Sequence, residues 1–330
     1  MKIFITGASG YIGGSVAVHL RDQGHEVTGL VRTEAASAGL EGLGLGSIIG
    51  HADTDVILRA VQANDAVINT AEADDVELLK PMLAALSGTG KGLIHTSGSS
   101  IMVDDAQGEV ASATIFDDDA AYTPMPHRLD RIAVDRLVRT AGVTDGIRAA
   151  VICPTMVYGD GRGLKRDSHQ IPMLIAKSRS LQAGVYIGKG APIWSNLFIG
   201  DLATLYRLAV DKAPAGAFFF AENGEATFLE IAEMVARSLG PSGATESWSL
   251  DDAVTEVGPV ARVALSTNCR VRATNAFSAG RLMGRHSRKS SLLSHSRLSP
   301  TPEPPETQEL ISWHTRFLMY RSQTRNSVVR

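Results

Sequence analysis

Three polar residues near the middle of the sequence recur at a spacing that could bring their side chains together for chemistry. His127, Arg131 and Asp135 are four residues apart, so an α-helix would place them on one face. A histidine titrates near neutral pH and can exchange protons, and a guanidinium can donate hydrogen bonds to an anion or a sugar hydroxyl. The same pattern also fits a helix edge that only faces solvent. The role of this segment therefore depends on where the rest of the chain positions it.

The same segment carries apolar residues at helical spacing. They are Leu129, Ile132, Ala133, Leu137 and Val138. Such a stripe can pack against a core. We therefore expect an amphipathic helix near residues 125–141.

A glycine-rich segment near the amino terminus is the strongest signal in the sequence. Gly7, Gly10 and Gly13 lie between an apolar strand at residues 2–7 and a helix at residues 11–24. The first glycine permits a tight turn, the second lets a pyrophosphate approach the backbone, and the third allows close packing of helix and strand. The helix amino terminus adds unpaired N–H groups and a positive dipole end. A purely structural turn is the alternative, but the flanking strand and helix favour dinucleotide binding.

The order of apolar strands and amphipathic helices predicts the fold. We expect strands at residues 2–7, 25–32, 65–70, 92–97 and 148–154, and helices at 11–24, 55–63, 73–87 and 125–141. Strands that alternate with helices form parallel βαβ units covered on both faces. The sequence therefore predicts an α/β fold with a doubly wound parallel sheet of Rossmann type.

The alternation loosens after Pro154 and indicates a smaller C-terminal substrate lobe. Helices are expected at 169–180 and 228–240, and a strand, a loop and a helix follow one another across 185–212. We divide the chain into a dinucleotide-binding Rossmann core at 1–154, a substrate lobe intertwined with it at 155–267, and a basic, partly disordered tail at 268–330.

Charge is unevenly distributed along the 330 residues. Residues 268–330 hold 11 of the 32 Lys and Arg residues but 3 of the 35 Asp and Glu residues. The remainder is therefore acidic, which argues against nucleic-acid binding by the folded body. The segment 284–309 is rich in Ser, Arg, His and Pro and has no hydrophobic period, so we expect a solvated tail. Phosphorylation of this tail, or nucleic-acid binding by it, is the alternative.

The two cysteines and the apolar runs limit the setting in which the chain works. Cys153 lies in an apolar strand and Cys269 in a polar segment, without the spacing of a disulfide framework or a metal site, so we expect no metal. The chain opens directly on a strand, and no apolar run is long enough to span a membrane. We expect a cytoplasmic monomer or homodimer that acts on a small-molecule substrate.

The glycine spacing and its surroundings resemble the short-chain dehydrogenase/reductase superfamily, and most closely its extended branch, the NAD-dependent epimerase/dehydratase family. The resemblance spans roughly residues 1–240 and includes NTA at 69–71, HTSGSS at 95–100, CPTMVYGDG at 153–161 and WSNLFIGDLA at 194–203. It implies that the glycine loop and the ends of later strands contact the cofactor, with Asp53 near the adenine. The implied positions are Gly7, Ser9, Gly10, Tyr11, Ile12, Gly13, Asp53, Thr70, Ala71 and Pro154.

The usual active-site motif of that family is replaced in this sequence. The family carries Tyr-x-x-x-Lys, in which Tyr exchanges a proton with the substrate and Lys binds the nicotinamide ribose, but no such motif occurs here. On this alignment His127 replaces Tyr, Arg131 replaces Lys, and Asp135 keeps an acidic position suited to holding Arg131. Ser97 or Ser99 would orient the substrate carbonyl. Either His127 and Arg131 form a working pair, or the site keeps only the fold.

The end of the second predicted strand bears on the choice of cofactor. NAD-binding folds usually place there an acidic residue that binds the ribose hydroxyls. Arg32 occupies that position, and its guanidinium can pair with a 2′-phosphate. We therefore expect NADP. Glu34 leaves NAD possible, and Arg32 could simply face solvent.

The resemblance implies an NAD(P)-dependent oxidoreductase that reduces or oxidises a small carbonyl or hydroxyl metabolite. An epimerase or dehydratase on a sugar-like substrate is one alternative, because all three reactions begin with hydride transfer at one carbon. Arg162, Lys165 and Arg166 could bind the diphosphate of a nucleotide sugar. A non-catalytic NAD(P)-binding sensor or scaffold is another alternative, favoured by the loss of Tyr and Lys.

Overall fold

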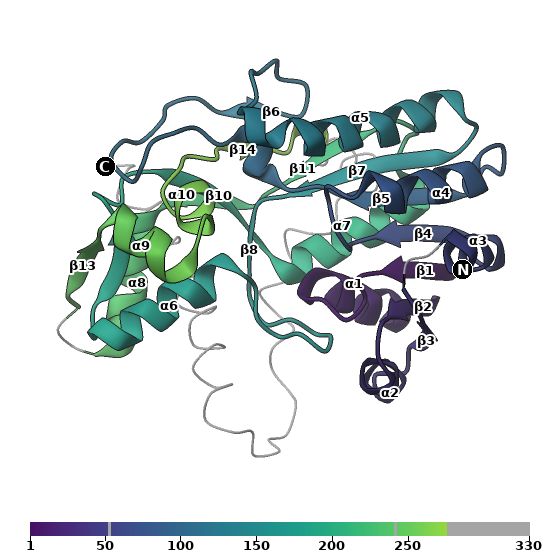
Figure 1. The fold of residues 1–330 in the computed structure, drawn as a ribbon, viewed down its shortest axis with the longest axis horizontal. Helices are drawn as coiled ribbons and strands as arrows, with labels where there is room; N and C mark the ends of the chain where they lie inside the picture. The colour runs from purple at the N-terminus through teal and green to yellow at the C-terminus, as the bar shows by residue number, and fades with distance from the viewer. Residues whose placement is uncertain (52–53, 241–242, 276–330) are drawn as a thin grey trace, which may run out of the picture.

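A parallel sheet forms the centre of the computed structural model, which describes residues 1–51, 54–240 and 243–275 (Figure 1). Within these residues seven strands are ordered β11-β7-β5-β4-β1-β2-β3, and all neighbouring pairs run parallel. The strands are β1 Lys2–Thr6, β2 Glu26–Val31, β3 Gly46–Ile49, β4 Ala66–Asn69, β5 Gly92–Thr96, β7 Arg148–Pro154 and β11 Phe218–Ala221. The strand order reverses between β1 and β4, so the predicted doubly wound sheet is confirmed.

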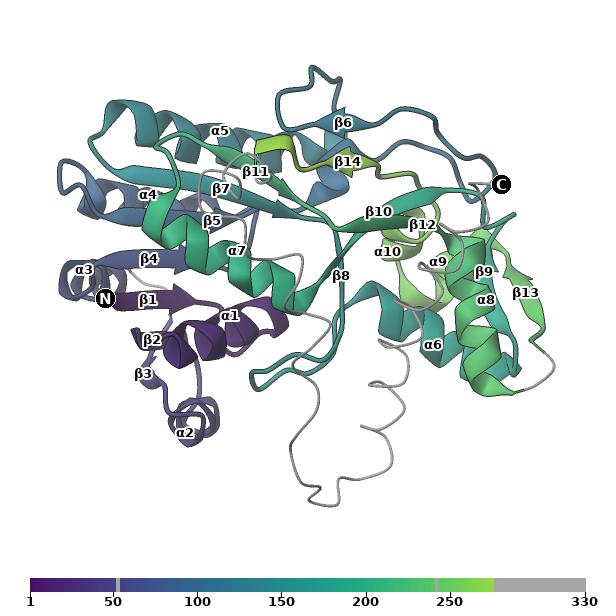
Figure 2. The same cartoon turned by 180° about the vertical axis from the view of Figure 1, so that it is seen from behind.

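Helices cover both faces of this sheet (Figures 1 and 2). One face packs against α1 Tyr11–Asp22, α2 Glu34–Gly42 and α7 Ile199–Lys212. The other packs against α3 Thr54–Ala63, α4 Val76–Leu86 and α5 Leu129–Thr144. Every residue of β4 and β5 is buried, which explains why these strands lack an alternation of apolar and charged residues.

A second, smaller lobe lies beyond the carboxyl ends of the strands (Figure 2). Its three-stranded sheet is ordered β12-β10-β8, and β9 pairs separately with β13. The strands are β8 Met156–Tyr158, β9 Gly184–Ile187, β10 Ile193–Phe198, β12 Gly224–Thr227 and β13 Thr245–Trp248, and the helices are α6 Gln170–Leu181, α8 Phe228–Leu239, α9 Leu250–Val257 and α10 Val260–Ala264.

The start of α8 shows how the sequence fixes an element in this lobe. The Thr227 hydroxyl accepts a hydrogen bond from the Glu230 N–H at 3.0 Å, and the Glu230 carboxylate accepts one from the Thr227 N–H at 2.7 Å. This capping box satisfies N–H groups that the first helical turn leaves free. The helix ends before Gly240, so the helix predicted at 228–240 is confirmed.

Several parts of the architecture differ from the sequence-based expectation, and among them the edge strand β11 of the central sheet is not predicted. Neither α2 nor β3 is predicted, because Ala and Gly make up much of the segment 34–49. The helix expected from residue 125 begins at Leu129 instead, after the short 3-10 turn η2, Pro126–Arg128. Proline at the first position of that turn lacks an N–H and fixes φ, which suits a helix start.

The packed body extends past residue 267, the predicted end of the substrate lobe. Cys269 and Val271 are fully buried, and β14 Val271–Arg272 pairs with β6 Phe116–Asp117. The buried Asp118 carboxylate accepts hydrogen bonds from the Thr274 hydroxyl at 2.9 Å and the Asn275 N–H at 2.6 Å. The segment 268–275 is therefore part of the folded body. The tail segment 284–309 lies outside the described residues.

Two truncations should separate this packed segment from the tail. Removing residues 284–330 should leave the melting temperature nearly unchanged, because that region lacks a core-forming pattern. Removing residues 268–330 deletes the buried Cys269 and Val271, and should cost about 4 kcal/mol, or roughly 10 °C in melting temperature. Thermal unfolding followed by circular dichroism gives both values. Equal melting temperatures for the two truncated chains would contradict the packing described here.

Candidate functional site

The glycine loop between β1 and α1 packs tightly against the carboxyl end of β4. Gly7 has a φ of +72°, and a Cβ at this position would lie 2.6 Å from the Thr70 carbonyl oxygen. A Cβ on Gly13 would collide with the Thr70 hydroxyl and the Gly7 carbonyl oxygen. Side chains are therefore excluded at both positions by the packing of the fold itself.

Gly10 is different, because space remains beside it. A Cβ at Gly10 would approach only the Gly7 carbonyl oxygen, at 3.1 Å, and its φ of −80° suits any residue. The first turn of α1 contains no acidic residue and receives no hydrogen bond from a capping side chain. Its N–H groups and the open space at Gly10 therefore fit the pyrophosphate of a dinucleotide.

The other residues of the loop differ in exposure, and one of them supports a neighbouring segment. Ser9 is exposed and Ile12 is half-buried. The Tyr11 hydroxyl donates a hydrogen bond to the Gly159 carbonyl oxygen at 2.7 Å, and the ring is buried. Tyr11 therefore braces the segment after β8 with its side chain, and only its backbone can face a cofactor.

The remaining predicted cofactor positions lie at the carboxyl edge of the sheet. Arg32 is exposed directly after β2 and makes no hydrogen bond or ion pair within the described part of the chain. Thr70 and Ala71 follow β4, and the Thr70 hydroxyl donates to the Thr6 carbonyl oxygen at 2.7 Å. Pro154 is buried at the end of β7. Asp53 lies outside the described residues.

Arg131 lies across the end of β5 and is held by partners that the sequence did not indicate. Its guanidinium donates to both oxygens of Asp74, at 2.6 and 2.9 Å, and to the Ser100 hydroxyl at 3.0 Å. These bonds from Arg131 hold the pKa of Asp74 below its usual range. The expectation that Asp135 holds Arg131 is wrong, because Asp135 hydrogen bonds elsewhere.

His127 does not share a helical face with the other two residues. It lies in η2, before α5 begins, and is exposed. The predicted apolar stripe also shifts, because Leu129 is 53% exposed while Ile132, Val134 and Val138 are buried. The helix is therefore turned so that Asp135, rather than Leu129, faces the core.

Ser97 and Ser99 follow β5 and are both buried, but they bond differently. The Ser97 hydroxyl donates a hydrogen bond to Asp135 Oδ2 at 2.7 Å. The backbone carbonyl of Ser99, in the 3-10 helix η1 Ser99–Met102, accepts from the Cys269 thiol at 3.2 Å. Burial raises the pKa of Asp135 to about 7, although the hydrogen bond from Ser97 opposes this shift. A hydroxyl joined to a carboxyl that titrates near neutrality can take part in proton transfer.

A row of polar residues beside this pair was missed by the sequence analysis. The Thr6 hydroxyl donates to Asn69 Oδ1 at 2.5 Å, and Asn69 Nδ2 lies 3.1 Å from His95 Nδ1. Sheet register pairs Thr6 with Asn69 and Asn69 with His95, so the three side chains lie in one line across the strand ends. Thr6 and Asn69 end their strands and His95 lies one residue before the end of β5, so only the pairing of the strands brings the three together.

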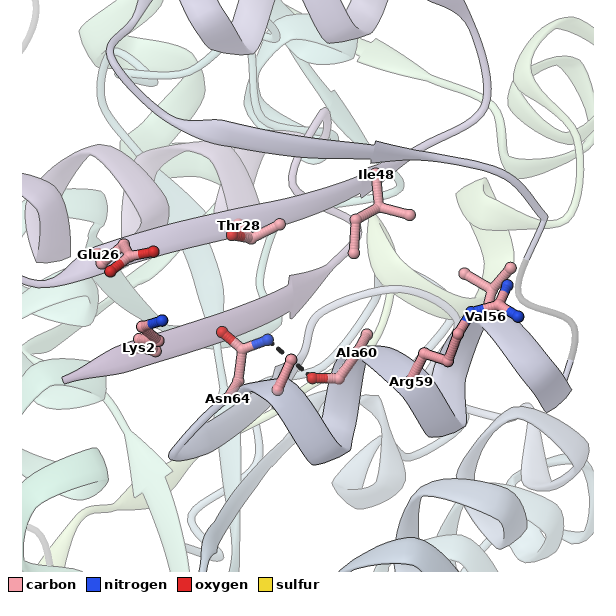
Figure 3. A pocket seen from close by; sticks show the side chains of 9 residues that line it. Lys2, Glu26, Thr28, Ile48, Val56, Arg59, Ala60 and Asn64 are labelled. Atoms are coloured by element: carbon pink, nitrogen blue, oxygen red, sulfur yellow. Dashed lines mark hydrogen bonds between the residues drawn. The ribbon is translucent and has the colours of Figure 1, made fainter.

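A separate groove of about 330 Å³ lies between α3 and strands β1, β2 and β3 (Figure 3). Lys2 and Glu26 line it at the amino ends of β1 and β2, and Arg59 lines it from α3. The glycine loop begins at the opposite, carboxyl end of β1. The groove is therefore distinct from the site formed by the loop and the polar row.

Among the described residues, no three His, Cys, Asp or Glu side chains gather as ligands for a metal ion. None of the helices described combines the length and apolarity needed to cross a membrane. Cys153 and Cys269 are both free and buried.

Comparisons with known proteins agree with this architecture. Oxidase ucsJ from Acremonium sp is 30% identical over 316 residues, which cover 83% of this chain and 90% of that protein. The 2-alkyl-3-oxoalkanoate reductase of Stenotrophomonas maltophilia (strain K279a) is 26% identical and covers 74% of this chain and 76% of its own length. The structure of dTDP-glucose 4,6-dehydratase from Bacillus anthracis str. Ames in complex with NAD superposes with a TM-score of 0.68. It covers 96% of this chain and 97% of its own at 14% identity, so that likeness shows the fold alone.

The match to a family model is more specific than these single comparisons. The model of the NAD dependent epimerase/dehydratase family matches residues 3–219, from β1 to the start of β11. This span contains the glycine loop, the polar row and α5. The chain belongs to the NAD-dependent epimerase/dehydratase family.

Proposed function

We propose that the protein is an NADP-preferring oxidoreductase that reduces a small ketone or aldehyde, or oxidises the corresponding alcohol. The observation that carries this proposal is the placement of two features at one edge of the sheet. The open position at Gly10 suits a dinucleotide, and the Ser97–Asp135 pair can exchange a proton. The proposal also takes support from the oxidase and reductase relatives named above.

The bound dinucleotide would supply or accept the hydride. The glycine loop and the first turn of α1 would bind its pyrophosphate, and Arg32 would pair with a 2′-phosphate. Arg131 is proposed to donate hydrogen bonds to the nicotinamide ribose, because it lies beside Gly98 at the end of β5. Ser97, with Ser99 beside it, would orient the substrate oxygen. His127 remains a candidate proton donor at the surface of the site.

A nucleotide-sugar epimerase or dehydratase is the less favoured alternative. Arg162 pairs with Asp22 of α1 at 2.7 Å, so that carboxylate already engages its charge. Arg166 lies 4.0 Å from Asp160 within its own loop. Only Lys165 of the three basic residues is left for a diphosphate, which is a weak basis for that substrate class.

A panel of ketones and aldehydes with NADPH tests the proposed reaction. The enzyme should consume NADPH with at least one member, whereas a binding-only sensor should bind NADPH without consuming it. We further propose that the enzyme works in the cytoplasm as a monomer or homodimer. Its two free, buried cysteines suit a reducing compartment.

Gly10→Val should abolish dinucleotide binding while leaving the fold intact. The branched side chain would fill the space proposed for the pyrophosphate, and the backbone at φ −80° accepts valine. Fluorescence titration with NADPH measures the loss. Gly13→Val is the contrasting variant and should fail to fold, because its side chain would collide with Thr70. A folded Gly10→Val protein with unchanged affinity would refute the assignment of the loop.

Arg32→Ala should weaken NADPH binding by roughly tenfold or more and leave NADH binding nearly unchanged. The lost charge-assisted contact to the 2′-phosphate is worth about 1.5–3 kcal/mol, and NADH lacks that group. Parallel titrations with the two cofactors give the ratio. An equal loss for both would show that Arg32 does not select the cofactor.

Arg131→Ala should weaken binding of both cofactors, because the ribose is common to them. The lost hydrogen bonds should lower the affinity by roughly tenfold. Asp74→Asn is the matched control: it weakens the partner of Arg131 but leaves the guanidinium in place, so binding should persist. If Arg131→Ala and the parent protein bind NADPH equally, the ribose contact is refuted.

A further inference from the structure

The hydrogen bonds of the polar row, Thr6, Asn69 and His95, determine which ring nitrogen of His95 carries the proton. Asn69 Oδ1 accepts from the Thr6 hydroxyl at 2.5 Å and from the Ala71 N–H at 3.3 Å, so the other end of this amide is the donor. Asn69 Nδ2 therefore donates to His95 Nδ1, at 3.1 Å. Burial lowers the pKa of His95 to about 4, so the ring is neutral at physiological pH. Its single ring proton consequently sits on Nε2.

Asp135 lies between this Nε2–H and Ser97. Its Oδ2 accepts from the Ser97 hydroxyl at 2.7 Å, and its Oδ1 faces His95 Nε2 at 3.8 Å. Oδ1 and Nε2 are both buried and make no close hydrogen bond among the described residues, although the backbone of Ala73 also lies near His95 and raises its pKa. A purely structural carboxylate at this depth would be expected to have its oxygens satisfied. The free Oδ1 leaves this group able to gain and lose a proton.

The charged groups around Asp135 do not outweigh the effect of burial on its pKa. The Arg131 and Arg139 guanidinium groups lower the pKa of the carboxyl and Asp74 raises it, but these effects are smaller than that of burial. Arg131 is engaged with Asp74 and Ser100, and Arg139 with the Gly216 carbonyl oxygen. The Tyr122 hydroxyl and the Cys153 thiol also lie near, and burial raises the pKa of each, so both are neutral. No cation therefore contacts the carboxyl among the described residues.

We propose that Asp135 holds the proton needed for carbonyl reduction and passes it through the Ser97 hydroxyl to the substrate oxygen, with the Nε2–H of His95 stabilising the carboxylate left behind. The inference rests on the proposed function and deepens it. It assigns to Ser97 and Asp135 the proton exchange with substrate that the Tyr of Tyr-x-x-x-Lys performs elsewhere in the family.

The transfer balances in atoms and charge. The O–H bond of Ser97 breaks as its proton joins the carbonyl oxygen, and the proton on Asp135 Oδ2 forms a new O–H bond with Ser97 Oγ. The substrate carbon would take the hydride that a bound reduced dinucleotide would supply, so that the carbonyl becomes an alcohol as the dinucleotide is oxidised. In the resulting state Ser97 donates to an ionised Asp135 across the same 2.7 Å contact. Solvent returns the proton to Asp135, and alcohol oxidation runs in reverse.

The hydrogen bonding of Ser97 favours Asp135 over His127 as the source of the proton. The Ser97 hydroxyl is already bonded to the carboxyl, whereas His127 is exposed on η2. Asp135 acts through Ser97 and is therefore a relay residue. Its contribution should appear in the pH dependence of the reaction and not only in the rate.

Asp135→Asn is the central variant, because its amide oxygen can still accept from Ser97 but its side chain cannot supply a proton. Turnover in carbonyl reduction should fall by about a hundredfold or more, while NADPH affinity stays within about twofold. The parent kcat/KM should fall as pH rises through about 7, since reduction needs protonated Asp135, and this limb should be absent from the variant. Asp130→Asn is the matched control, because Asp130 is an exposed carboxylate on the same helix, and it should retain parent turnover within about threefold.

A measurement without cofactor tests the proton directly. Protein labelled with 13C at the aspartate carboxyls should show one carboxyl signal that titrates near pH 7 and is missing in Asp135→Asn. Failure to find that signal would overturn the relay. So would full turnover by Asp135→Asn, or a pH limb in Asp135→Asn that is unchanged from the parent. If the parent consumes no carbonyl compound at all, both the proposed function and the relay fail, whereas turnover by both proteins removes the relay alone.

Discussion

The register of the parallel sheet is the constraint on which the site depends. It aligns the carboxyl ends of β1, β4 and β5 so that Thr6, Asn69 and His95 form one hydrogen-bonded line on the face covered by α5. A shift of one residue in any strand would turn its polar side chain to the opposite face. The same strand ends hold the glycine loop against Thr70. The cofactor edge and the proton-holding carboxyl are therefore positioned by one set of backbone pairings.

The parts of the fold that could be predicted are those whose signals are local. The glycine loop lies between β1 and α1 as expected, because its spacing and its flanking elements can be recognised along the chain. The strand expected at 148–154 matches β7, since seven residues buried mostly on both faces leave an uninterrupted apolar run. Helix α8 carries its own start and stop signals in Thr227, Glu230 and Gly240.

The parts that could not be predicted depend on which face of an element meets the core. Helical spacing in α5 offers more than one apolar stripe, and the choice that included Leu129 left Asp135 on the polar side. The structure turns the helix the other way, so Asp135 meets Ser97 and Arg131 reaches Asp74 on a distant loop. Cys269 presents the same difficulty. It is flanked by polar residues, yet it is buried because the segment pairs alongside β10 through a parallel bridge to Trp194.

The buried Asp135 costs the fold stability, and this cost is a reason to assign it a role. Its pKa is near 3.8 in an unfolded chain and about 7 in the folded protein, so the folded state binds the proton more tightly. Stability is greatest below the unfolded pKa and is lost as pH rises through the folded value. Above pH 7 the loss is on the order of 4 kcal/mol, which is a large part of the stability of a typical domain. An apolar residue would avoid this cost. A carboxyl at this position, joined to Ser97 and facing His95, is instead suited to moving a proton at the edge where the cofactor is proposed to bind.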